Sequence, residues 1–475
     1  MITIHSILKE IAALFAARKK EVCLVGGAVR DMIRREAVQD WDLATNAPPA
    51  EVMAIFREAR PPGRVFPTGI KHGTITALYR GRSLEITTYR TEADYSDGRR
   101  PDAVRYAATI EEDLARRDFT MNAIALRLPG GETVDPFGGE ADIRARIIRC
   151  VGKAEERFSE DGLRPLRAVR FAAQLGFELE QHTEAAIPAA LSVSAKVSRE
   201  RVRDELDKIL ASPRPSRALL LMEKTGLMEL FLPELAACRG VEQKGFHRFD
   251  VLDHSLLACD YAAGKQYPPE VRAAALLHDT GKPVTRKMEL EGVWSFYHHE
   301  AESEKIARNI LGRLRYPGAF IDAVCHLVKE HMFHYTGEWT DAAVRRFIVR
   351  AGETNLENLY RLRMADACAI AGAEPPPDFL LPLTRRVDRV LSESRALSLK
   401  DLAVSGKDLM AIGISPGKTM GIILNELLET VLDDPAQNAR EQLLEIAGEL
   451  NGKLKAGLIR KPQFPNKATE ENSLF

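Results

Sequence analysis

The spacing of hydrophobic residues divides the chain into a mixed first part and a helical remainder. Within residues 1–145, short apolar or alternating runs at 22–25, 71–79 and 82–89 predict strands. Helices are predicted between them, at 28–35 and 48–60. From residue 146 onward, the apolar residues recur at helical spacing. We therefore expect an α+β fold, in which a head with a mixed sheet precedes all-α parts.

Two glycines separate the first predicted strand from its helix. Gly26 and Gly27 stand where the strand ends and the helix begins. Glycine has no Cβ, so a phosphate can approach its main chain closely. The free N–H groups of a helix N-terminus also attract anions. The pattern predicts a phosphate-binding turn.

Three carboxylates are predicted to project from neighbouring strands of the head. Asp40 and Asp42 flank Trp41, and residues two apart in a strand share one face. The alternation at 84–86 turns Glu85 away from the apolar face, which makes it a candidate third carboxylate or simply an exposed strand residue. Paired carboxylate oxygens are suitable ligands for the Mg²⁺ ions that bind a nucleoside triphosphate. We expect Asp40 and Asp42 to hold Mg²⁺.

A dense polar group lies beside an apolar run in the sequence LARRDFTMNA, residues 114–123. It contains Arg116, Arg117, Asp118 and Asn122. The two arginines alone would fit a basic helix end, but the added carboxylate and amide favour a binding site.

In the helical part, residues 159–164 are predicted to open a helix that runs to about Leu175 and stops at Gly176. Asp161 and Arg164 are three residues apart, so we expect them on one helical face. Such a pair is either a local surface ion pair or a two-residue binding site.

Histidines and aspartates recur in apolar helical runs of the middle region. The predicted metal ligands are His254, His278, Asp279, His299, His331 and Asp366. Imidazole and carboxylate groups together are typical of a divalent metal centre. The sequence leaves two alternatives open, since His298 could replace His299 and His334 could replace His331.

Bulk composition adds three constraints. A length of 475 residues predicts two to four domains, and the net charge of −1 requires any RNA site to be a local basic surface. The six cysteines show no Cys-x-x-Cys spacing, which fits free thiols in a reducing compartment. The N-terminal segment is not a signal peptide, and no apolar run is long enough for a membrane span. We expect a cytoplasmic protein without a membrane partner.

The motifs GGAVRD, DWDLAT and RRDFTMNA resemble those of the class II tRNA nucleotidyltransferase and bacterial poly(A) polymerase family, whose head is polymerase β-like. The resemblance implies that Asp118 and its neighbours recognise the ribose of an incoming nucleotide. It continues through EDGLR at 160–164 and LRAVRF at 166–171. The nucleotide-binding residues it implies are Gly26, Gly27, Arg30, Asp31, Arg116, Arg117, Asp118, Asn122, Asp161, Arg164, Arg167 and Arg170. The implied catalytic residues are Asp40, Asp42 and Glu85.

The middle region resembles the HD phosphohydrolase superfamily through HDTGKP at 278–283. That resemblance implies a metal-dependent phosphohydrolase acting on terminal or 2′,3′-cyclic phosphates. The metal is Mg²⁺ or a divalent transition metal.

Together the two resemblances predict four parts: a nucleotidyltransferase head (1–145), a helical neck for base selection and RNA contact (146–245), an HD module (246–372) and a helical tail that contacts tRNA (373–475). The expected activity is addition of CMP and AMP to the tRNA 3′ end from CTP and ATP, with no role for DNA. Addition of A only, CC only or a poly(A) tail are alternatives within the family. A rival makes the HD module the main enzyme and the head a nucleotide sensor.

Overall fold

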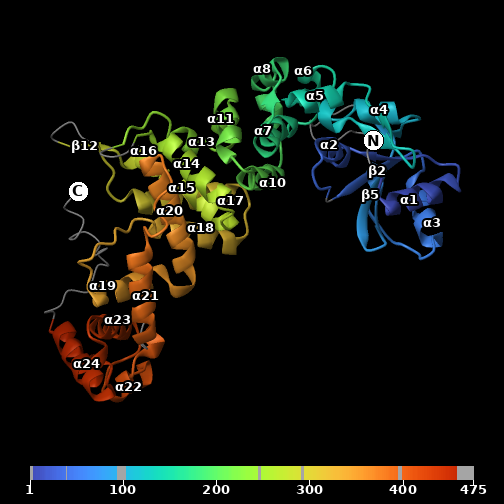
Figure 1. Cartoon of the computed structure of the whole chain (residues 1–475). Coiled ribbons are helices and arrows are strands. Elements are labelled where there is room, and N and C mark those ends of the chain that lie inside the picture. Colours follow the sequence, from blue (N-terminus) through green and yellow to red (C-terminus); the bar gives the residue numbers. More distant parts are fainter. Residues whose placement is uncertain are drawn as a thin grey trace. The chain divides into compact units, whose positions relative to one another are not determined.

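The computed structural model describes residues 4–38, 40–93, 103–243, 248–289, 294–393 and 398–456 (Figure 1). The chain forms two compact units. The first contains Met1–Val328 and Cys368–Gly372, and the second contains Lys329–Ala367 and Ala373–Phe475. The finer division into head, neck, HD module and tail stays a prediction.

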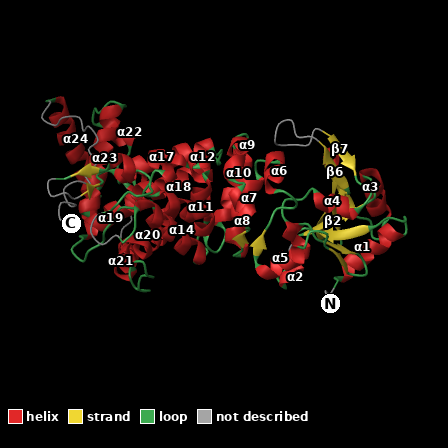
Figure 2. Cartoon of the chain, turned by 90° about the horizontal axis from the view of Figure 1, so that it is seen from above, coloured by secondary structure: helices red, strands yellow, loops and turns green. Residues whose placement is uncertain are grey.

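The head is built on a seven-stranded mixed sheet with strand order β3-β4-β5-β2-β1-β8-β9. Its strands are β1 (Val22–Val25), β2 (Trp41–Thr45), β3 (Arg64–Gly69), β4 (Thr74–Tyr79), β5 (Arg82–Thr88), β8 (Ala125–Arg127) and β9 (Glu132–Val134). A separate antiparallel pair comprises β6 (Arg90–Ala93) and β7 (Ala103–Tyr106), seen in Figure 2. The predicted strands at 22–25, 71–79 and 82–89 are confirmed.

Helices flank this sheet. They are α1 (Ser6–Ala16), α2 (Gly27–Arg34), α3 (Pro49–Glu58), α4 (Ile110–Ala115) and α5 (Gly139–Ala145). Figure 1 shows α1 and α3 together beside β5. Leu84 and Ile86 of β5 are fully buried, whereas Glu85 between them is exposed, as the alternation predicts. The open face of β2 and β5 is therefore left for polar side chains.

The neck follows the head within the first unit. Its helices are α6 (Ala154–Glu160), α7 (Arg164–Leu175), α8 (Gln181–Ala185), α9 (Leu191–Ser194), α10 (Arg199–Leu210), α11 (Pro215–Thr225), α12 (Leu227–Phe231) and α13 (Pro233–Ala236). A short parallel pair, β10 (Ile147–Ile148) with β11 (Glu178–Leu179), interrupts the helices. The part after the head is nevertheless largely helical, as predicted.

The prediction of one helix through Asp161 and Arg164 is wrong. Helix α6 ends at Glu160, Asp161 has extended backbone angles, and α7 begins at Arg164 with a proline in its first turn. Gly162 lies against the backbone of Val193, where a Cβ would be only 2.5 Å from the carbonyl oxygen. This close packing requires glycine and holds the chain in a turn. Asp161 and Arg164 therefore do not share a helical face.

The remainder of the first unit carries three of the predicted histidine ligands, His254, His278 and His299. Its helices are α14 (Val251–Gly264), α15 (Pro269–Leu277), α16 (Lys282–Thr285), α17 (His299–Arg313) and α18 (Gly318–Glu330). A two-stranded antiparallel sheet, β12 (Lys287–Met288) with β13 (Trp294–Ser295), lies between α16 and α17 in the sequence. Helices α14 and α15 pack closely on each other.

The second unit is helical over its described residues. It contains α19 (Asp341–Ala351), most of α20 (Leu356–Ala371), α21 (Leu381–Glu393), α22 (Gly406–Ala411), α23 (Lys418–Asp433) and α24 (Arg440–Lys455). A hydrophobic core joins α22, α23 and α24 through side chains such as Leu409, Leu427 and Leu443. Among the described residues of the whole chain, we find no helix with the length and apolar character to cross a membrane.

Candidate functional site

Carboxylates gather where β2 and β5 lie side by side. Parallel pairing places Asp42 directly beside Glu85, and Asp40 stands two residues before Asp42. Burial raises the pKa of Asp42, the charge of Glu85 raises it further, and Arg117 opposes them. A carboxylate that has lost hydration and faces another negative charge is stabilised by a bound cation. The donor set therefore fits a hard divalent ion such as Mg²⁺.

The glycine turn lies against these carboxylates. Gly26 has φ +70°, and a Cβ there would lie 3.0 Å from Nη1 of Arg117 and 3.9 Å from Oδ2 of Asp42. Only glycine allows this backbone to approach both side chains. Gly27 is the first residue of α2. The turn thus brings main-chain N–H groups, a guanidinium and a carboxylate together, as a triphosphate–metal site needs.

Arg30 and Asp31 link α2 to the polar cluster at 116–122. Arg30 is buried and donates from Nη1 to Asn122 Oδ1 at 2.9 Å. Its Nε and Nη2 donate to the two carboxylate oxygens of Asp31, at 2.9 and 3.0 Å. These three predicted nucleotide-binding residues form one network. This network connects α2, which follows the Gly26–Gly27 turn, to the polar cluster.

Asp118 is the most constrained carboxylate of the head. Its Oδ1 accepts from the Phe119 backbone N–H at 2.8 Å and from Asn122 Nδ2 at 3.2 Å. Its Oδ2 accepts from Nε and Nη2 of Arg167, at 2.8 and 2.6 Å. Burial alone raises the pKa of Asp118, but Arg167, Asn122 and Arg164 outweigh burial and lower the pKa to about 2. The carboxylate is therefore ionised at neutral pH.

Asp161 and Arg164, two of the predicted nucleotide-binding residues, both bond to residues around them. Asp161 accepts from both terminal nitrogens of Arg201, at 2.8 and 3.2 Å. Arg164 is buried and donates to the backbone carbonyls of Arg157 and Arg116, at 2.9 and 3.0 Å, and also contacts Glu160. The two residues lie in one turn, in which the Arg164 backbone N–H donates to the Asp161 carbonyl oxygen at 2.9 Å.

Arg170 lies inside the neck. It is 5% exposed, forms an ion pair with Glu205, and stacks on the Phe171 ring with Cζ 3.7 Å from the ring centroid. Arg170 bonds to Glu205 and Gln174, both in the neck, which suits a structural role better than the predicted contact with a nucleotide.

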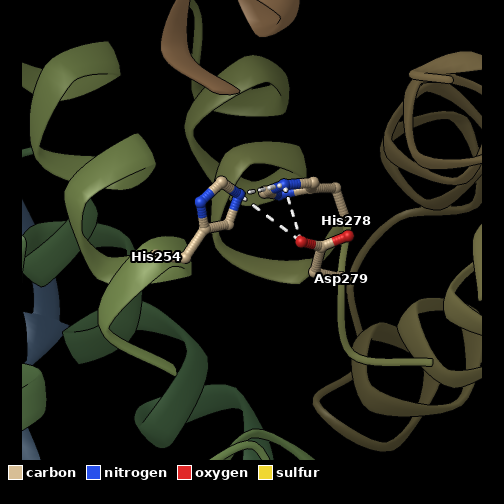
Figure 3. Close-up of side chains that lie close together, drawn as sticks. All are labelled: His254, His278 and Asp279. Atoms are coloured by element: carbon tan, nitrogen blue, oxygen red, sulfur yellow. Dashed lines mark hydrogen bonds and ion pairs between the residues drawn. The ribbon is translucent and has the colours of Figure 1, made fainter. Parts of the chain in front are cut away.

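A second cluster lies in the middle region, where Figure 3 shows two imidazoles and a carboxylate pointing toward one another. Nε2 of His254 is 3.1 Å from Nε2 of His278, and Oδ2 of Asp279 lies 3.4 and 3.5 Å from these nitrogens. His299 Nε2 is 3.2 Å from Asp279 Oδ1. All four side chains are buried. Potential ligand atoms from His254, His278 and Asp279 converge closely enough to hold a metal ion.

Lys282 belongs to the same cluster. Its Nζ lies 2.6 Å from Asp279 Oδ2 and 2.6 Å from Gln243 Oε1. Burial alone raises the pKa of Asp279, but Lys282, His278 and His299 outweigh burial and hold the pKa well below its usual range. The donor set of imidazoles and an ionised carboxylate fits a divalent metal.

Burial distinguishes the two histidines in each of the alternatives that the sequence left open. His299 and His331 are buried, whereas His298 and His334 are exposed. Asp366 is also buried and accepts from Arg363 at 2.6 Å. His331 and Asp366 belong to the second unit. Their predicted role as ligands stays a prediction.

Sequence reasoning missed Asp113, which anchors the two arginines of the polar cluster. Its side chain is 1% exposed and accepts from Arg116 at 2.8 Å and from Arg117 at 3.2 Å. Burial alone raises the pKa of Asp113, but the two arginines outweigh burial and lower it. Positions three and four residues apart on a helix are neighbours, so the spacing from 113 to 116 and 117 was a usable signal.

Fold and site together define a nucleotidyltransferase-type head joined to helical domains. Residues 22–149 match the model of the poly(A) polymerase head domain, and residues 176–239 match that of the "Probable RNA and SrmB- binding site of polymerase A". Residues 288–447 match the model of tRNA nucleotidyltransferase domain 2. No model for HD phosphohydrolases is among these matches.

Curated relatives identify the family. The A-adding tRNA nucleotidyltransferase of Deinococcus radiodurans is 36% identical over 86% of this chain and 90% of its own length. The CCA-adding enzyme of Anoxybacillus flavithermus is 33% identical over 90% of this chain and 92% of its own. The chain therefore belongs to the family of CCA-adding and A-adding tRNA nucleotidyltransferases.

Other comparisons differ in coverage. The CCA-adding enzyme of Geobacillus stearothermophilus is 49% identical, but the match spans 45% of this chain and only half of that enzyme. Among solved structures, the Bacillus stearothermophilus CCA-adding enzyme in complex with CTP has a TM-score of 0.71 and 31% identity, and the match covers 95% of this chain and 98% of that one. This structural match confirms the mixed-sheet head and the largely helical remainder.

We predict that Asp113→Asn weakens both the fold and nucleotide binding. Removing one partner of a buried ion pair costs about 3 kcal/mol, because Arg116 and Arg117 lose their counter-charge. Arg117 also lies beside Gly26 and Asp42, so the KM for the nucleoside triphosphate should rise. Urea denaturation and steady-state kinetics measure the two effects. The matched control is Asp322→Asn, whose exposed ion pair with Arg308 should contribute little. Unchanged stability and KM in Asp113→Asn would contradict the anchoring role.

Proposed function

We propose that this chain adds CMP and AMP to the 3′ end of tRNA, using CTP and ATP and no nucleic-acid template. The observation that carries the proposal is the pairing of Asp42 with Glu85 beside the Gly26 turn and Arg117. Asp40 and Asp42 would hold Mg²⁺, with Glu85 adjacent. When bound there, Mg²⁺ supplies positive charge to the triphosphate and acidity to the attacking 3′-hydroxyl.

Around that centre, the chain's own groups bind and orient the substrates. Main-chain N–H groups at the start of α2 and the Arg117 guanidinium are suited to phosphate oxygens. The pair Asp118–Arg167 is suited to the sugar, and Asp161 to the base. The neck and the second unit are proposed to contact tRNA, since relatives of this architecture are named as tRNA enzymes.

The family contains enzymes with different products. One near-full-length relative is named A-adding and another CCA-adding, so the likeness favours neither product. The structural relative with 31% identity was solved in complex with CTP. This complex supports the proposal that the present chain adds C and not A alone. CC-only and poly(A) addition are the other options that the experiment must separate.

We predict that the wild type extends tRNA lacking one to three terminal nucleotides only with labelled CTP or ATP, in the order CCA, and leaves the complete tRNA unextended. Asp42→Asn should abolish transfer, because the group of Asp40, Asp42 and Glu85 loses one of the negative charges that would hold the metal. The affinity for tRNA should stay near that of the wild type. The readouts are a gel of extended tRNA and a binding titration. Asp204→Asn, at an exposed ion pair on α10, is the matched control. Addition of A alone would assign the A-adding product. Wild-type rates in Asp42→Asn would refute the metal assignment.

Asp161 is the better candidate for base selection. Its pair with Arg201 is partly exposed and costs about 1 kcal/mol to open, whereas Arg164 is buried and bonded to two carbonyls. A carboxylate only accepts hydrogen bonds, so at the position where cytosine and adenine present an amino group it meets a donor, whereas uracil and guanine present a carbonyl there and acceptor would face acceptor.

We predict that Asp161→Ala relaxes the preference for CTP and ATP over UTP and GTP by at least roughly tenfold, because an unpaired buried acceptor costs about 1–3 kcal/mol. Incorporation of each labelled nucleotide by wild type and variant measures the change. Asp204→Ala controls for loss of a neck carboxylate. If Asp161→Ala keeps the full preference for C and A, the base is chosen by other residues.

We also propose a second activity, a phosphohydrolase that acts on terminal or 2′,3′-cyclic phosphates. The convergence of His254, His278, Asp279 and His299 favours it. These side chains would hold a divalent metal, which when bound supplies Lewis acidity to a phosphate ester. The grouping of Asp40, Asp42 and Glu85 in the head argues against the alternative hypothesis that the head only senses nucleotides.

We predict that the wild type retains a divalent metal and hydrolyses nucleoside 2′,3′-cyclic phosphates or terminal phosphates with Mg²⁺, Mn²⁺, Ni²⁺ or Co²⁺. His299→Ala should lower metal content and hydrolysis, while nucleotide addition persists because the head has its own ligands. The control is His298→Ala, a neighbouring histidine that is exposed. Metal analysis and phosphate release are the measurements. If the wild type neither binds metal nor hydrolyses any of these substrates, the cluster is structural.

A further inference from the structure

Two cations follow the candidate metal ligand Asp279 in the chain, and both stack on aromatic rings. Lys282 is the first residue of α16, and Arg286 directly follows the last. Lys282 Nζ lies 5.8 Å from the centroid of the Phe296 ring, and Arg286 Cζ lies 3.6 Å from that of the Trp294 ring. Trp294 begins β13 and Phe296 directly follows this strand, and residues two apart in an extended segment share a face. One aromatic face therefore holds both cations.

The two cations differ in their partners. Lys282 is buried, and its Nζ lies 2.6 Å from Asp279 Oδ2 and 2.6 Å from Gln243 Oε1. The side chain of Arg286 forms no ion pair or hydrogen bond with any residue that the structure describes, and its Nε is buried. A guanidinium has five N–H groups, and stacking on a ring fixes the plane in which they point. Arg286 is therefore oriented to bind an anion.

The spacing of the two cations sets the kind of anion. The rings beneath them are two residues apart, which corresponds to about 7 Å along an extended strand. Four residues of helix, from Lys282 to Arg286, correspond to about 6 Å. Neighbouring phosphates of an RNA strand are separated by a similar distance. A terminal phosphate at the cluster that contains Asp279 would thus place the preceding phosphodiester near Arg286.

Large apolar side chains on either side of Arg286 in the sequence are exposed. Val284 and Met288 stand two residues before and after it, Tyr297 comes next after Phe296, and all three are more than half exposed. Exposed aromatic rings stack on unpaired bases, and basic groups among them bind phosphates. An apolar protein partner would strip the hydration from Arg286 without replacing it. This mixture of groups therefore favours an unpaired RNA strand over an apolar protein surface.

We propose that Arg286 binds the phosphodiester next to a terminal phosphate, so that the hydrolase site takes the end of an RNA strand and not a free mononucleotide. This inference rests on the proposed phosphohydrolase activity and names its substrate class. The reacting phosphate lies at the cluster that contains Asp279. The preceding phosphate accepts hydrogen bonds from the Arg286 guanidinium, and Tyr297 offers its ring to a base.

The test compares three substrates on the full-length chain. They are a nucleoside 2′,3′-cyclic phosphate, a dinucleotide that ends in a 2′,3′-cyclic phosphate, and the same dinucleotide with an uncharged methylphosphonate linkage. For the wild type, kcat/KM for the charged dinucleotide should exceed that for the other two by roughly tenfold, because only its linkage offers a charged acceptor. Arg286→Met keeps an apolar stem on Trp294 but removes the charge. It should lower the ratio of charged to uncharged dinucleotide to about one.

Binding is measured separately from hydrolysis. Dinucleotides with a 3′-phosphate and a charged or uncharged linkage are titrated by calorimetry in the presence of EDTA. The wild type should prefer the charged linkage, and Arg286→Met should not. The matched control is Arg308→Met, an exposed arginine of α17 that bonds to Glu304 and Asp322, and it should keep the preference. Melting temperatures report folding, and Arg286→Gln replaces Arg286→Met if the latter does not fold.

Three results would overturn the proposal. The first is equal binding of both linkages by the wild type, and the second is an unchanged preference in Arg286→Met. The third is tighter binding of a nucleoside 3′,5′-bisphosphate than of the charged dinucleotide, which would make the ligand a free nucleotide. If the wild type hydrolyses none of the cyclic phosphates, the proposed phosphohydrolase activity is refuted, whereas the calorimetric comparison still tests the phosphate contact of Arg286.

Discussion

The nucleotide site of the head depends on a clamp that the neck supplies. Arg157 donates to the Ala115 carbonyl at 3.1 Å, and Arg164 donates to the Arg116 carbonyl at 3.0 Å. Arg167 completes the clamp through its fork to Asp118. Main-chain carbonyls at a helix end need donors, and the guanidinium groups of Arg157 and Arg164 supply them, while Arg167 pairs with the Asp118 carboxylate. The segment 115–118 is thereby held by residues of α6 and α7, so the polar cluster of the head is not formed by the head sequence alone.

The two important carboxylates of the head lie in opposite electrostatic environments. Asp118 meets a guanidinium and an amide, so its charge is compensated and its pKa is low. Asp42 is buried and lies beside the charge of Glu85, and Arg117 offsets these two effects only in part. The pKa of Asp42 is therefore raised. A compensated carboxylate is suited to fixing another side chain, whereas an uncompensated one is suited to binding a cation. The fold therefore provides one carboxylate with the charge compensation that suits positioning and one with the charge excess that suits cation binding.

How much the sequence could predict depended on whether local rules decided the outcome. Glu85 was placed correctly because strand alternation is set by local geometry, and the pairing with Asp42 followed from the sheet. Asp161 was placed wrongly because Gly162 packs on the distant Val193 carbonyl, a contact that helical periodicity does not contain. Asp113 could have been found from helical spacing, but nothing local distinguished it from the acidic residues beside it. Ion-pair partners that are distant in the sequence, such as Arg201 for Asp161, could not be identified from the local sequence pattern.

The middle cluster shows how a motif can conceal a packing requirement. The glycine of HDTGK is set by packing, since a Cβ on Gly281 would lie 2.5 Å from the His299 carbonyl and 2.6 Å from the Ser303 backbone nitrogen. The glycine is needed because α17 passes directly over the start of α16, and Ser303 Oγ accepts from the Gly281 N–H at 2.8 Å. That close approach is what brings His299 against Asp279, while His298, with φ +61°, caps the helix and stays exposed. The spacing of the motif is thus explained by helix packing first, and the convergence of the ligand atoms is its consequence.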